Sequence, residues 1–220
     1  AIVGSQDSSE NRHGMLLSEK QYGDFVVRLK YKSLKGNSGF YFRVQKVDHA
    51  VSVKGFQAEI DADGKDVGGL YETLGRAWVV LPKPEDIKTC YNDKDWNEMT
   101  ISAIGGEVTG TVNGVQTASL KDDPGPREGY FGMQLHGGQN MHVLFKDLEI
   151  KELPGSVQPV ISEKIHDTSR PLPEIVQPQS LESLSDSRQP PQNAVVLFDG
   201  TSLDQWQGGS WQIKDGILET

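Results

Sequence analysis

Apolar and polar side chains alternate along much of the first 152 residues, with the period of two that is typical of β-strands. Between Phe25 and Tyr31, for example, Arg28 and Lys30 separate apolar neighbours, which predicts a half-buried strand. Similar runs lie at 40–44, 55–61, 76–81, 96–103, 107–112, 115–120, 130–136 and 141–151. Turn residues separate them, including Asn113-Gly114, and no long stretch has helical periodicity. The pattern predicts an all-β fold, a two-sheet antiparallel β-sandwich.

The pattern ends abruptly after residue 152. Residues 153–193 contain seven prolines, many Ser and Gln, and only scattered aliphatic side chains. A structureless loop of that length is unusual inside a compact domain, so this segment is interpreted as a linker. The predicted organisation is therefore a main β-sandwich body at 1–152, a linker at 153–193 and a short β-rich tail at 194–220.

The tail resembles the two opening strands of a domain, with nothing after them to pack against. As a flexible coil, the linker would span on the order of 35 Å, about the width of a domain of this size. The tail can therefore complete its own chain, giving a circular permutation, or complete a neighbouring copy, giving a homodimer by strand exchange. It can also begin a following repeat. Docking in cis or in trans is favoured, because Trp206 and Trp211 would otherwise be exposed.

Composition narrows the choice of partners. The chain carries 31 acidic and 22 basic side chains, a formal net charge of −9. Such a surface repels phosphate backbones, so we expect no nucleic-acid partner. No apolar run approaches the roughly 18–20 residues of a membrane helix, so we expect no membrane span. Cys90 is the sole cysteine, which rules out an intramolecular disulfide and a cysteine-based metal site.

Three of the predicted strands carry unusual polar side chains on the face opposite their apolar residues. These side chains are Tyr41, Arg43, Gln57, Glu59, Asp61, Gln134 and His136. They could simply form the solvated face of a sandwich. Their composition argues otherwise, because an Arg close to carboxylates would hold them ionised, and mixed amide, carboxylate and aromatic groups match sugar hydroxyls. The sequence therefore predicts a carbohydrate partner.

Several motifs support a family resemblance. They lie at 197–206, 211–218, 22–25, 37–43, 54–60, 69–71, 96–98, 112–115, 135–138 and 145–150. On these motifs the chain resembles the 3-keto-disaccharide hydrolase domain family. The family order places the tail motifs first, which agrees with a permuted or exchanged domain.

The resemblance implies a concanavalin-like jelly roll with a carbohydrate site on its concave sheet. It also implies a secreted or periplasmic protein, although no signal peptide is present in this sequence. Family members are linked to cleaving glycosides that are oxidised at the sugar 3-position. A 3-keto group acidifies the C2 proton, so a base can remove it and the glycosidic oxygen can leave. This chemistry needs a base, a group that stabilises the enolate, and an acid for the departing oxygen.

The resemblance and the shared strand face suggest roles for particular residues. Glu59 is the predicted base, and Arg43 and His136 are predicted to stabilise negative charge or donate a proton. The predicted substrate-binding residues are Gln57, Tyr71, Asn37, Tyr41, Gln134, Asp61 and Trp78, the last by stacking on a ring. No cofactor or metal is expected. Calcium bound by Glu59, Asp61 and Asp63 is an alternative to a local turn at these residues.

Three functions remain open at this point. The first is a hydrolase or lyase that acts on 3-keto disaccharides or glycosides, which predicts Glu59 in a pocket close to Arg43 and His136. The second is a non-catalytic carbohydrate-binding module, because one fold hosts many functions. The third is a structural or interaction domain of a larger secreted protein, which predicts a sheet face without a pocket.

Overall fold

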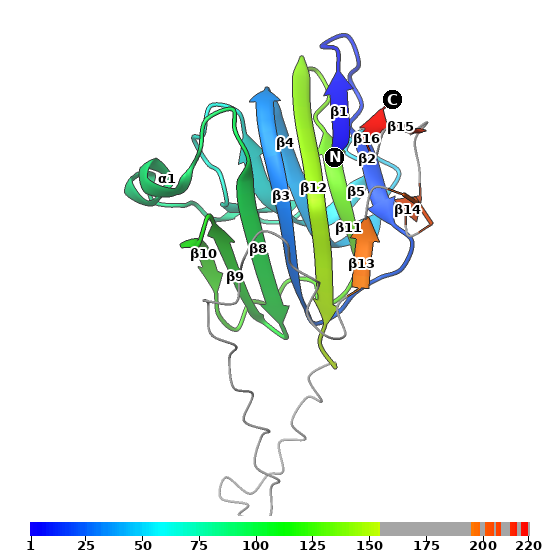
Figure 1. Cartoon of the computed structure of the whole chain (residues 1–220). Helices are drawn as coiled ribbons and strands as arrows, with labels where there is room; N and C mark the ends of the chain where they lie inside the picture. The colour runs from blue at the N-terminus through cyan, green and yellow to red at the C-terminus, as the bar shows by residue number, and fades with distance from the viewer. Residues whose placement is uncertain (155–194, 199–200, 205, 208–211, 215–216, 220) are drawn as a thin grey trace, which may run out of the picture.

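Strands dominate the computed structural model of the chain (Figure 1). The structure describes residues 1–154, 195–198, 201–204, 206–207, 212–214 and 217–219. The helix in these ranges, α1 (Pro84–Cys90), begins with proline, whose missing N–H costs nothing in the first turn. No described helix has the length and apolar character needed to cross a membrane.

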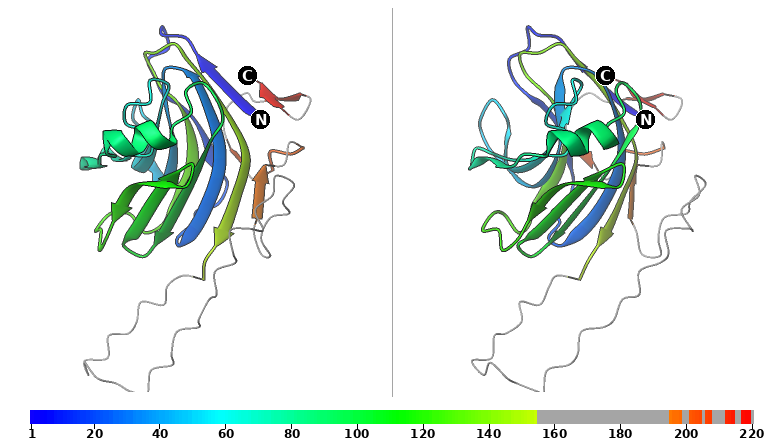
Figure 2. Two further views of the ribbon diagram at one scale, coloured as in Figure 1. Left: turned by 60° about the vertical axis from the view of Figure 1, so that its left-hand side comes forward. Right: turned by 90° about the vertical axis from the view of Figure 1, so that its left-hand side faces the viewer.

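The described strands form two sheets, seen as layers in Figure 2. Sheet A has nine strands, in the order β10-β9-β8-β3-β12-β1-β16-β15, with β13 also paired to β12. Its strands are β1 (Ile2–Gln6), β3 (Phe25–Lys35), β8 (Asn97–Ile104), β9 (Glu107–Val112), β10 (Val115–Leu120), β12 (Met141–Glu152), β13 (Val195–Phe198), β15 (Gln212–Lys214) and β16 (Ile217–Glu219). Neighbouring strands are antiparallel, except that β1 and β16 are parallel.

Sheet B has seven strands, in the order β14-β2-β11-β4-β5-β6-β7. They are β2 (Gly14–Ser18), β4 (Asn37–Lys46), β5 (Val53–Asp61), β6 (Leu70–Thr73), β7 (Ala77–Val80), β11 (Tyr130–Leu135) and β14 (Trp206–Gln207). The predicted fold class, an all-β two-sheet sandwich, is therefore confirmed.

The hydrophobic core lies between the two sheets and is rich in aromatic rings. Phe42 of β4 stacks on Phe56 of β5 with centroids 5.3 Å apart, and Phe25 of β3 meets Phe131 of β11 edge to face at 4.7 Å. Each such side chain contributes about 1.5–3 kcal/mol when fully buried. Because residues in a strand alternate between its faces, burying these rings sends the intervening side chains of β4, β5 and β11 to the other face of sheet B.

The structure differs from the predicted strands mainly at their ends. The sequence predicts a strand that begins at Phe40 after a turn, but β4 begins at Asn37 and pairs there with Asp61. The turn is reduced to Gly36, whose φ of 73° lies in the left-handed region that glycine adopts without strain. Helix α1 and strands β1, β2 and β6 were not predicted, because each is too short to show a clear period.

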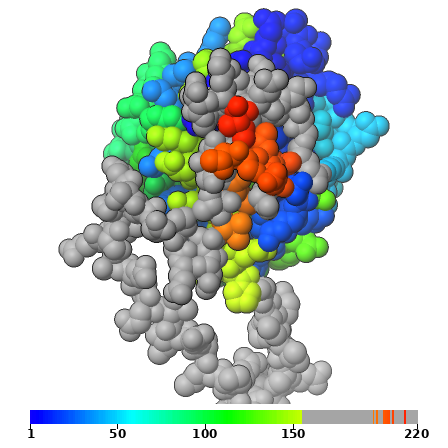
Figure 3. All heavy atoms as spheres, turned by 45° about the vertical axis from the view of Figure 1, so that its right-hand side comes forward, coloured from blue at the N-terminus to red at the C-terminus, as the bar shows by residue number. Residues whose placement is uncertain are grey.

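The described tail strands lie against the first 152 residues of the same chain. β13 pairs with β12, β14 pairs with β2, and β16 pairs with β1 through Ile2 and Leu218. Trp206 is buried, and its Nε1 donates a hydrogen bond to the Leu197 carbonyl at 2.7 Å. Figure 3 shows these residues, in orange and red, next to the blue N-terminal region and yellow-green β12.

The predicted boundaries at 152 and 194 stay predictions, as do permutation and strand exchange. Most of the proposed linker, 155–194, lies outside the described residues, as does Trp211. The pairings place the described tail strands beside β12, β1 and β2 of the same chain.

The contact made by Trp206 leads to a stability prediction. We expect Trp206→Ala to lower the free energy of unfolding by about 3–5 kcal/mol, because a buried Trp leaves a large cavity when truncated. Urea denaturation followed by circular dichroism measures this. Val195→Ala, on an exposed position of β13, is the control and should cost no more than about 0.5 kcal/mol.

The same experiment distinguishes the two modes of docking. If the tail completes its own chain, the denaturation midpoint is independent of protein concentration, whereas an exchanged dimer becomes more stable as concentration rises. Equal effects of the two substitutions would contradict the docking of the tail altogether.

Candidate functional site

The outer face of sheet B carries a row of polar side chains across its central strands. Tyr41 of β4 pairs with Gln57 of β5, which pairs in turn with Tyr71 of β6. One step along, Gly39 pairs with Glu59. A side chain at Gly39 would have its Cβ only 2.5 Å from Gln57 Nε2, so glycine there leaves the space in which the Gln57 amide lies.

A cavity of about 360 Å³ opens on this face. It is lined by His13, Asn37, Tyr41, Val51, Gln57, Glu59, Tyr71, Thr73, Leu74, Trp78, Gln134 and His136. The structure therefore brings together most of the residues predicted from the sequence. Arg43 and Asp61 are not among them. The cavity also counts against the structural-domain hypothesis, which predicts a face without a pocket.

Glu59 is buried in the wall of this cavity, with 5% of its surface exposed. The Asn37 side-chain amide donates a hydrogen bond to Oε1, and Gln57 Nε2 donates to Oε2 at 2.8 Å. Burial raises the pKa of Glu59 to about 8, with Asp61 and Asp66 adding to the rise and the Asn37 hydrogen bond opposing it. In its ionised form, a carboxylate with a raised pKa is a stronger base than an exposed one.

Gln134 lies between Gln57, which contacts Glu59, and His13. Gln134 Nε2 donates to the Tyr41 hydroxyl at 3.0 Å and lies 2.7 Å from His13 Nδ1. The Tyr41 hydroxyl also accepts from Thr73 at 3.4 Å. These buried polar groups are therefore joined in one network, as buried polar groups must be to offset their desolvation.

Two histidines form one side of the cavity. The rings of His13 and His136 lie 4.3 Å apart, and His136 Nδ1 donates to the Gly137 carbonyl at 2.7 Å, since a carbonyl can only accept. Burial, together with the neighbouring His136 and His49, lowers the pKa of His13 to about 4. His13 is therefore uncharged at neutral pH.

His13 was not among the predicted site residues, because it lies in the loop between β1 and β2 and shows no ligand spacing. That loop is held by contacts with distant segments. The His13 N–H donates to the Ala50 carbonyl at 2.9 Å, and the Gly138 N–H donates to the Glu10 carbonyl at 2.6 Å. Nothing local in the sequence signals these contacts.

An aromatic pair forms another side of the cavity. Tyr71 and Trp78, which pair across β6 and β7, meet edge to face with centroids 5.3 Å apart. Trp78 is 38% exposed, so a large apolar surface borders the polar groups. Such a combination can take both the hydroxyls and the apolar face of a sugar ring.

Arg43 lies elsewhere, which corrects the prediction that it accompanies Glu59. Phe42 pairs with Phe56 and Gln45 pairs with Lys54, so β4 holds one extra residue there, a β-bulge. The φ of Arg43 is 52°, and the bulge turns its side chain away from the outer face. The polar alternation read from the sequence is thus interrupted at this residue.

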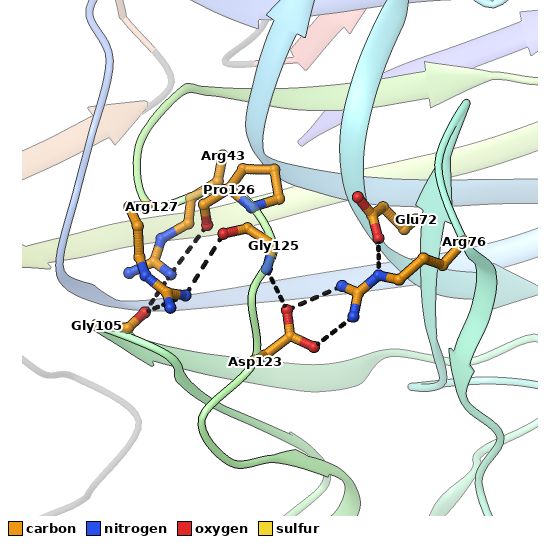
Figure 4. Close-up of polar contacts among 8 residues, drawn as sticks. All are labelled: Arg43, Glu72, Arg76, Gly105, Asp123, Gly125, Pro126 and Arg127. Atoms are coloured by element: carbon orange, nitrogen blue, oxygen red, sulfur yellow. Dashed lines mark hydrogen bonds and ion pairs between the residues drawn. The ribbon is translucent and has the colours of Figure 1, made fainter.

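The Arg43 guanidinium is fully buried near one end of the sandwich. It donates to Asp24 Oδ1 at 3.0 Å and to the Gly23 carbonyl. It also donates to the carbonyls of Gly105 and Pro126 (Figure 4). Every side of the guanidinium is therefore used by the fold, which leaves it no contact with a ligand in the cavity.

Asp61 also lies outside the cavity lining. Its Oδ1 accepts a hydrogen bond from the Asp63 N–H at 2.9 Å, as in an Asx-type turn. Among the described residues, no group of three or more His, Cys, Asp or Glu side chains could hold a metal ion. The hydrogen bond between Asp63 and Asp61 agrees with the turn interpretation of these two residues.

An ion cluster holds the hairpin that carries Trp78. Arg76, in the turn between β6 and β7, donates to both carboxylate oxygens of Asp123 at 2.8 and 2.9 Å (Figure 4). It also pairs with Glu72. This bidentate contact fastens the β6–β7 hairpin to the loop before β11 and so supports one wall of the cavity.

The fold and the site define the class: a β-sandwich with a pocket of mixed hydrogen-bond donors and acceptors around a buried carboxylate. Residues 1–151 match the 3-keto-alpha-glucoside-1,2-lyase-like domain family, so the chain belongs to that family. The resemblance drawn from the motifs is thereby confirmed. No curated protein matches the chain.

Solved structures resemble the chain at low identity. A protein of unknown function with a galectin-like fold from Bacillus subtilis has a TM-score of 0.53 and 12% identity, covering 68% of this chain and 81% of its own. A candidate glycosyl hydrolase from Parabacteroides distasonis has a TM-score of 0.49 and 18% identity, covering 64% and 84%. The carbohydrate binding module CBM66 from Bacillus subtilis has a TM-score of 0.48 and 18% identity, covering 63% and 81%. The first of these supports the fold alone.

The buried ion pair of Arg43 gives a testable consequence. We expect Arg43→Met to cost about 3–5 kcal/mol of unfolding free energy, because it removes the guanidinium that balances the buried Asp24 charge. The double variant Arg43→Met with Asp24→Asn should recover part of this loss, since the amide keeps an acceptor for the Gly105 N–H without the charge. Urea denaturation of both variants measures the difference.

Arg127 provides the matched control for this prediction. It is exposed and donates to the Gly105 carbonyl at 3.2 Å, so Arg127→Met should cost no more than about 1 kcal/mol. A cost for Arg43→Met as small as that of the control would contradict a structural role for the buried pair.

Proposed function

We propose that this protein is a lyase that cleaves the glycosidic bond of a sugar oxidised at C3. The observation that carries the proposal is Glu59, a buried carboxylate with a pKa raised to about 8, in the wall of a cavity made of hydroxyl-matching side chains. Membership of the 3-keto-alpha-glucoside-1,2-lyase-like domain family supports the choice of substrate.

The proposed reaction is an elimination. Glu59 removes the proton from C2, and the electron pair of the C2–H bond moves towards C3, whose oxygen takes the negative charge. When the C3 carbonyl re-forms, a double bond forms between C1 and C2 and the bond from C1 to the glycosidic oxygen breaks. The proton held by Glu59 then passes to the departing oxygen, which leaves as a hydroxyl. Atoms and charges balance without a further reactant.

The amides beside Glu59 prepare the carboxylate for this role. Hydrogen bonds from Asn37 and Gln57 to its two oxygens fix the direction of the carboxylate. A base held in one orientation loses little entropy when it reaches the C2 proton. The raised pKa brings its proton affinity closer to that of the carbon acid, which lowers the cost of the transfer.

The remaining lining residues bind the sugar in this proposal. Tyr71 and Trp78 contact the apolar face of a ring. Gln134, Tyr41 and Asn37 lie where they can meet hydroxyls, and His136 presents Nε2, because its Nδ1 is used by the Gly137 carbonyl. Arg43 has no part in the reaction, because it is enclosed by its ion pair with Asp24.

The role of Glu59 is tested by Glu59→Gln with a 3-keto-glycoside as substrate. We expect the substitution to lower kcat by at least about a thousandfold, since the amide cannot accept a proton, while the affinity for the substrate changes little. For the wild type, kcat/KM should rise with pH around a midpoint of about 8, because Glu59 acts as a base only when it is ionised and its pKa is raised to about 8.

The controls for this test separate catalysis from binding. Glu85→Gln, on the exposed side of helix α1, should behave as the wild type. Unchanged turnover in Glu59→Gln, or a rate that falls as pH rises through 8, would contradict the assignment of Glu59 as the base. Binding of saccharides without turnover by the wild type would instead favour the carbohydrate-binding alternative.

A further inference from the structure

The proposed elimination needs, besides the base Glu59, a group that stabilises the charge on the C3 oxygen. Negative charge develops on the C3 oxygen and needs a hydrogen-bond donor close by. Among the described residues, the cavity lining contains no Lys or Arg, and Arg43 is enclosed elsewhere. The lining does offer uncharged donors, and the amide network indicates which of them is free to act.

The network begins at Glu59. Gln57 Nε2 lies 2.8 Å from Glu59 Oε2 and 3.4 Å from the Ser38 carbonyl. Because a carbonyl can only accept, the Gln57 group at this position is the NH2 group, whether or not Glu59 is ionised. The same Nε2 lies 3.5 Å from Gln134 Oε1. The orientation of the Gln57 amide thus requires Gln134 to turn its oxygen towards Gln57, since the reverse orientation would bring two donors together.

The orientation of the Gln134 amide in turn decides which ring nitrogen of His13 carries the proton. With its oxygen towards Gln57, Gln134 directs its NH2 group at the Tyr41 hydroxyl, 3.0 Å away, and at His13 Nδ1, 2.7 Å away. An NH2 group can only donate, so Nδ1 must accept and the ring proton of neutral His13 must lie on Nε2. No described residue accepts a hydrogen bond from that Nε2–H.

We propose that His13, in its neutral Nε2–H form, donates a hydrogen bond to the C3 oxygen of the substrate as that oxygen takes up negative charge. This inference rests on the proposed function. His13 keeps its proton throughout: the C2 proton goes to Glu59, and when the C3 carbonyl re-forms the negative charge leaves with the glycosidic oxygen, which takes the proton from Glu59.

The surroundings of His13 suit this role in two further ways. Its ring packs on His136 at 4.3 Å and its backbone N–H is fixed to Ala50, so the donor is held in place before the substrate arrives. Burial lowers the pKa of His13 to about 4, which keeps the ring neutral over the working range. Protonation at Nδ1 would also set a second proton against the NH2 group of Gln134.

The first experiment compares two substitutions at His13 in the full chain, with a 3-keto-glycoside as substrate. His13→Phe keeps the ring but removes the donor, and should lower kcat by about 10²–10³-fold, the usual effect of losing one such donor, with KM changed less than about threefold. His13→Gln offers an amide NH2 near the position of Nε2 and should recover at least about tenfold of that loss. His142→Phe, on the outer face of sheet A, is the matched control and should leave kcat unchanged.

The second experiment measures the tautomer without any substrate. Nitrogen-15 NMR of histidine-labelled protein should show His13 protonated on Nε2 and not on Nδ1. In Gln134→Glu the carboxylate can no longer donate to Nδ1, so a proton should appear there and the pKa of His13 should rise. These results do not depend on activity, and they decide the case if His13→Phe does not fold.

The results of these experiments distinguish failure of the inference about His13 from failure of the proposed function. A kcat for His13→Phe within threefold of the wild type, no recovery in a folded His13→Gln, or an Nδ1–H tautomer in the wild type would overturn the inference about His13. If Glu59→Gln is inactive while His13→Phe is not, this inference falls and the proposed function stands. If the wild type does not turn over 3-keto-glycosides, the proposed function falls and the role of His13 falls with it.

Discussion

The alternation of buried apolar and outward-facing polar side chains along β4, β5 and β11 is the constraint on which the rest of the structure depends. Phe40, Phe42 and Phe56 are buried between the sheets, and their burial fixes the strands that carry them. Because successive side chains of a strand point to opposite faces, Tyr41, Gln57 and Glu59 must lie on the outer face of sheet B. The candidate site therefore takes its rigidity from the aromatic core on the opposite face of the same strands.

Burial imposes a second condition on this face, because polar groups removed from water must find partners. Glu59, Gln57, Gln134 and Tyr41 satisfy one another in a continuous network, and each amide has one orientation that leaves no donor facing a donor. A raised pKa at Glu59 and a lowered pKa at His13 follow from the same burial, since desolvation disfavours the charged form of both. One environment thus raises the pKa of a carboxyl group and keeps a neighbouring imidazole neutral.

The site is completed by segments far from these strands in the sequence. The β1–β2 loop brings His13, and the β6–β7 hairpin brings Trp78. The first is held by backbone hydrogen bonds to other turns, and the second by the bidentate contact of Arg76 with Asp123. The central strands define the polar face, whereas these two segments turn that face into a cavity.

Local pattern was sufficient for the fold class and for the shared polar face of Gln57 and Glu59, because strand periodicity is a short-range property. The motifs were sufficient for the family. Only the tertiary structure placed Arg43 in an ion pair with Asp24, since one extra residue in β4 reverses the side on which every later side chain lies, and a bulge leaves no mark in the alternation around it. Only the tertiary structure likewise brought His13 beside Gln134, since the two lie 121 positions apart and meet through the packing of loops, which no local period encodes.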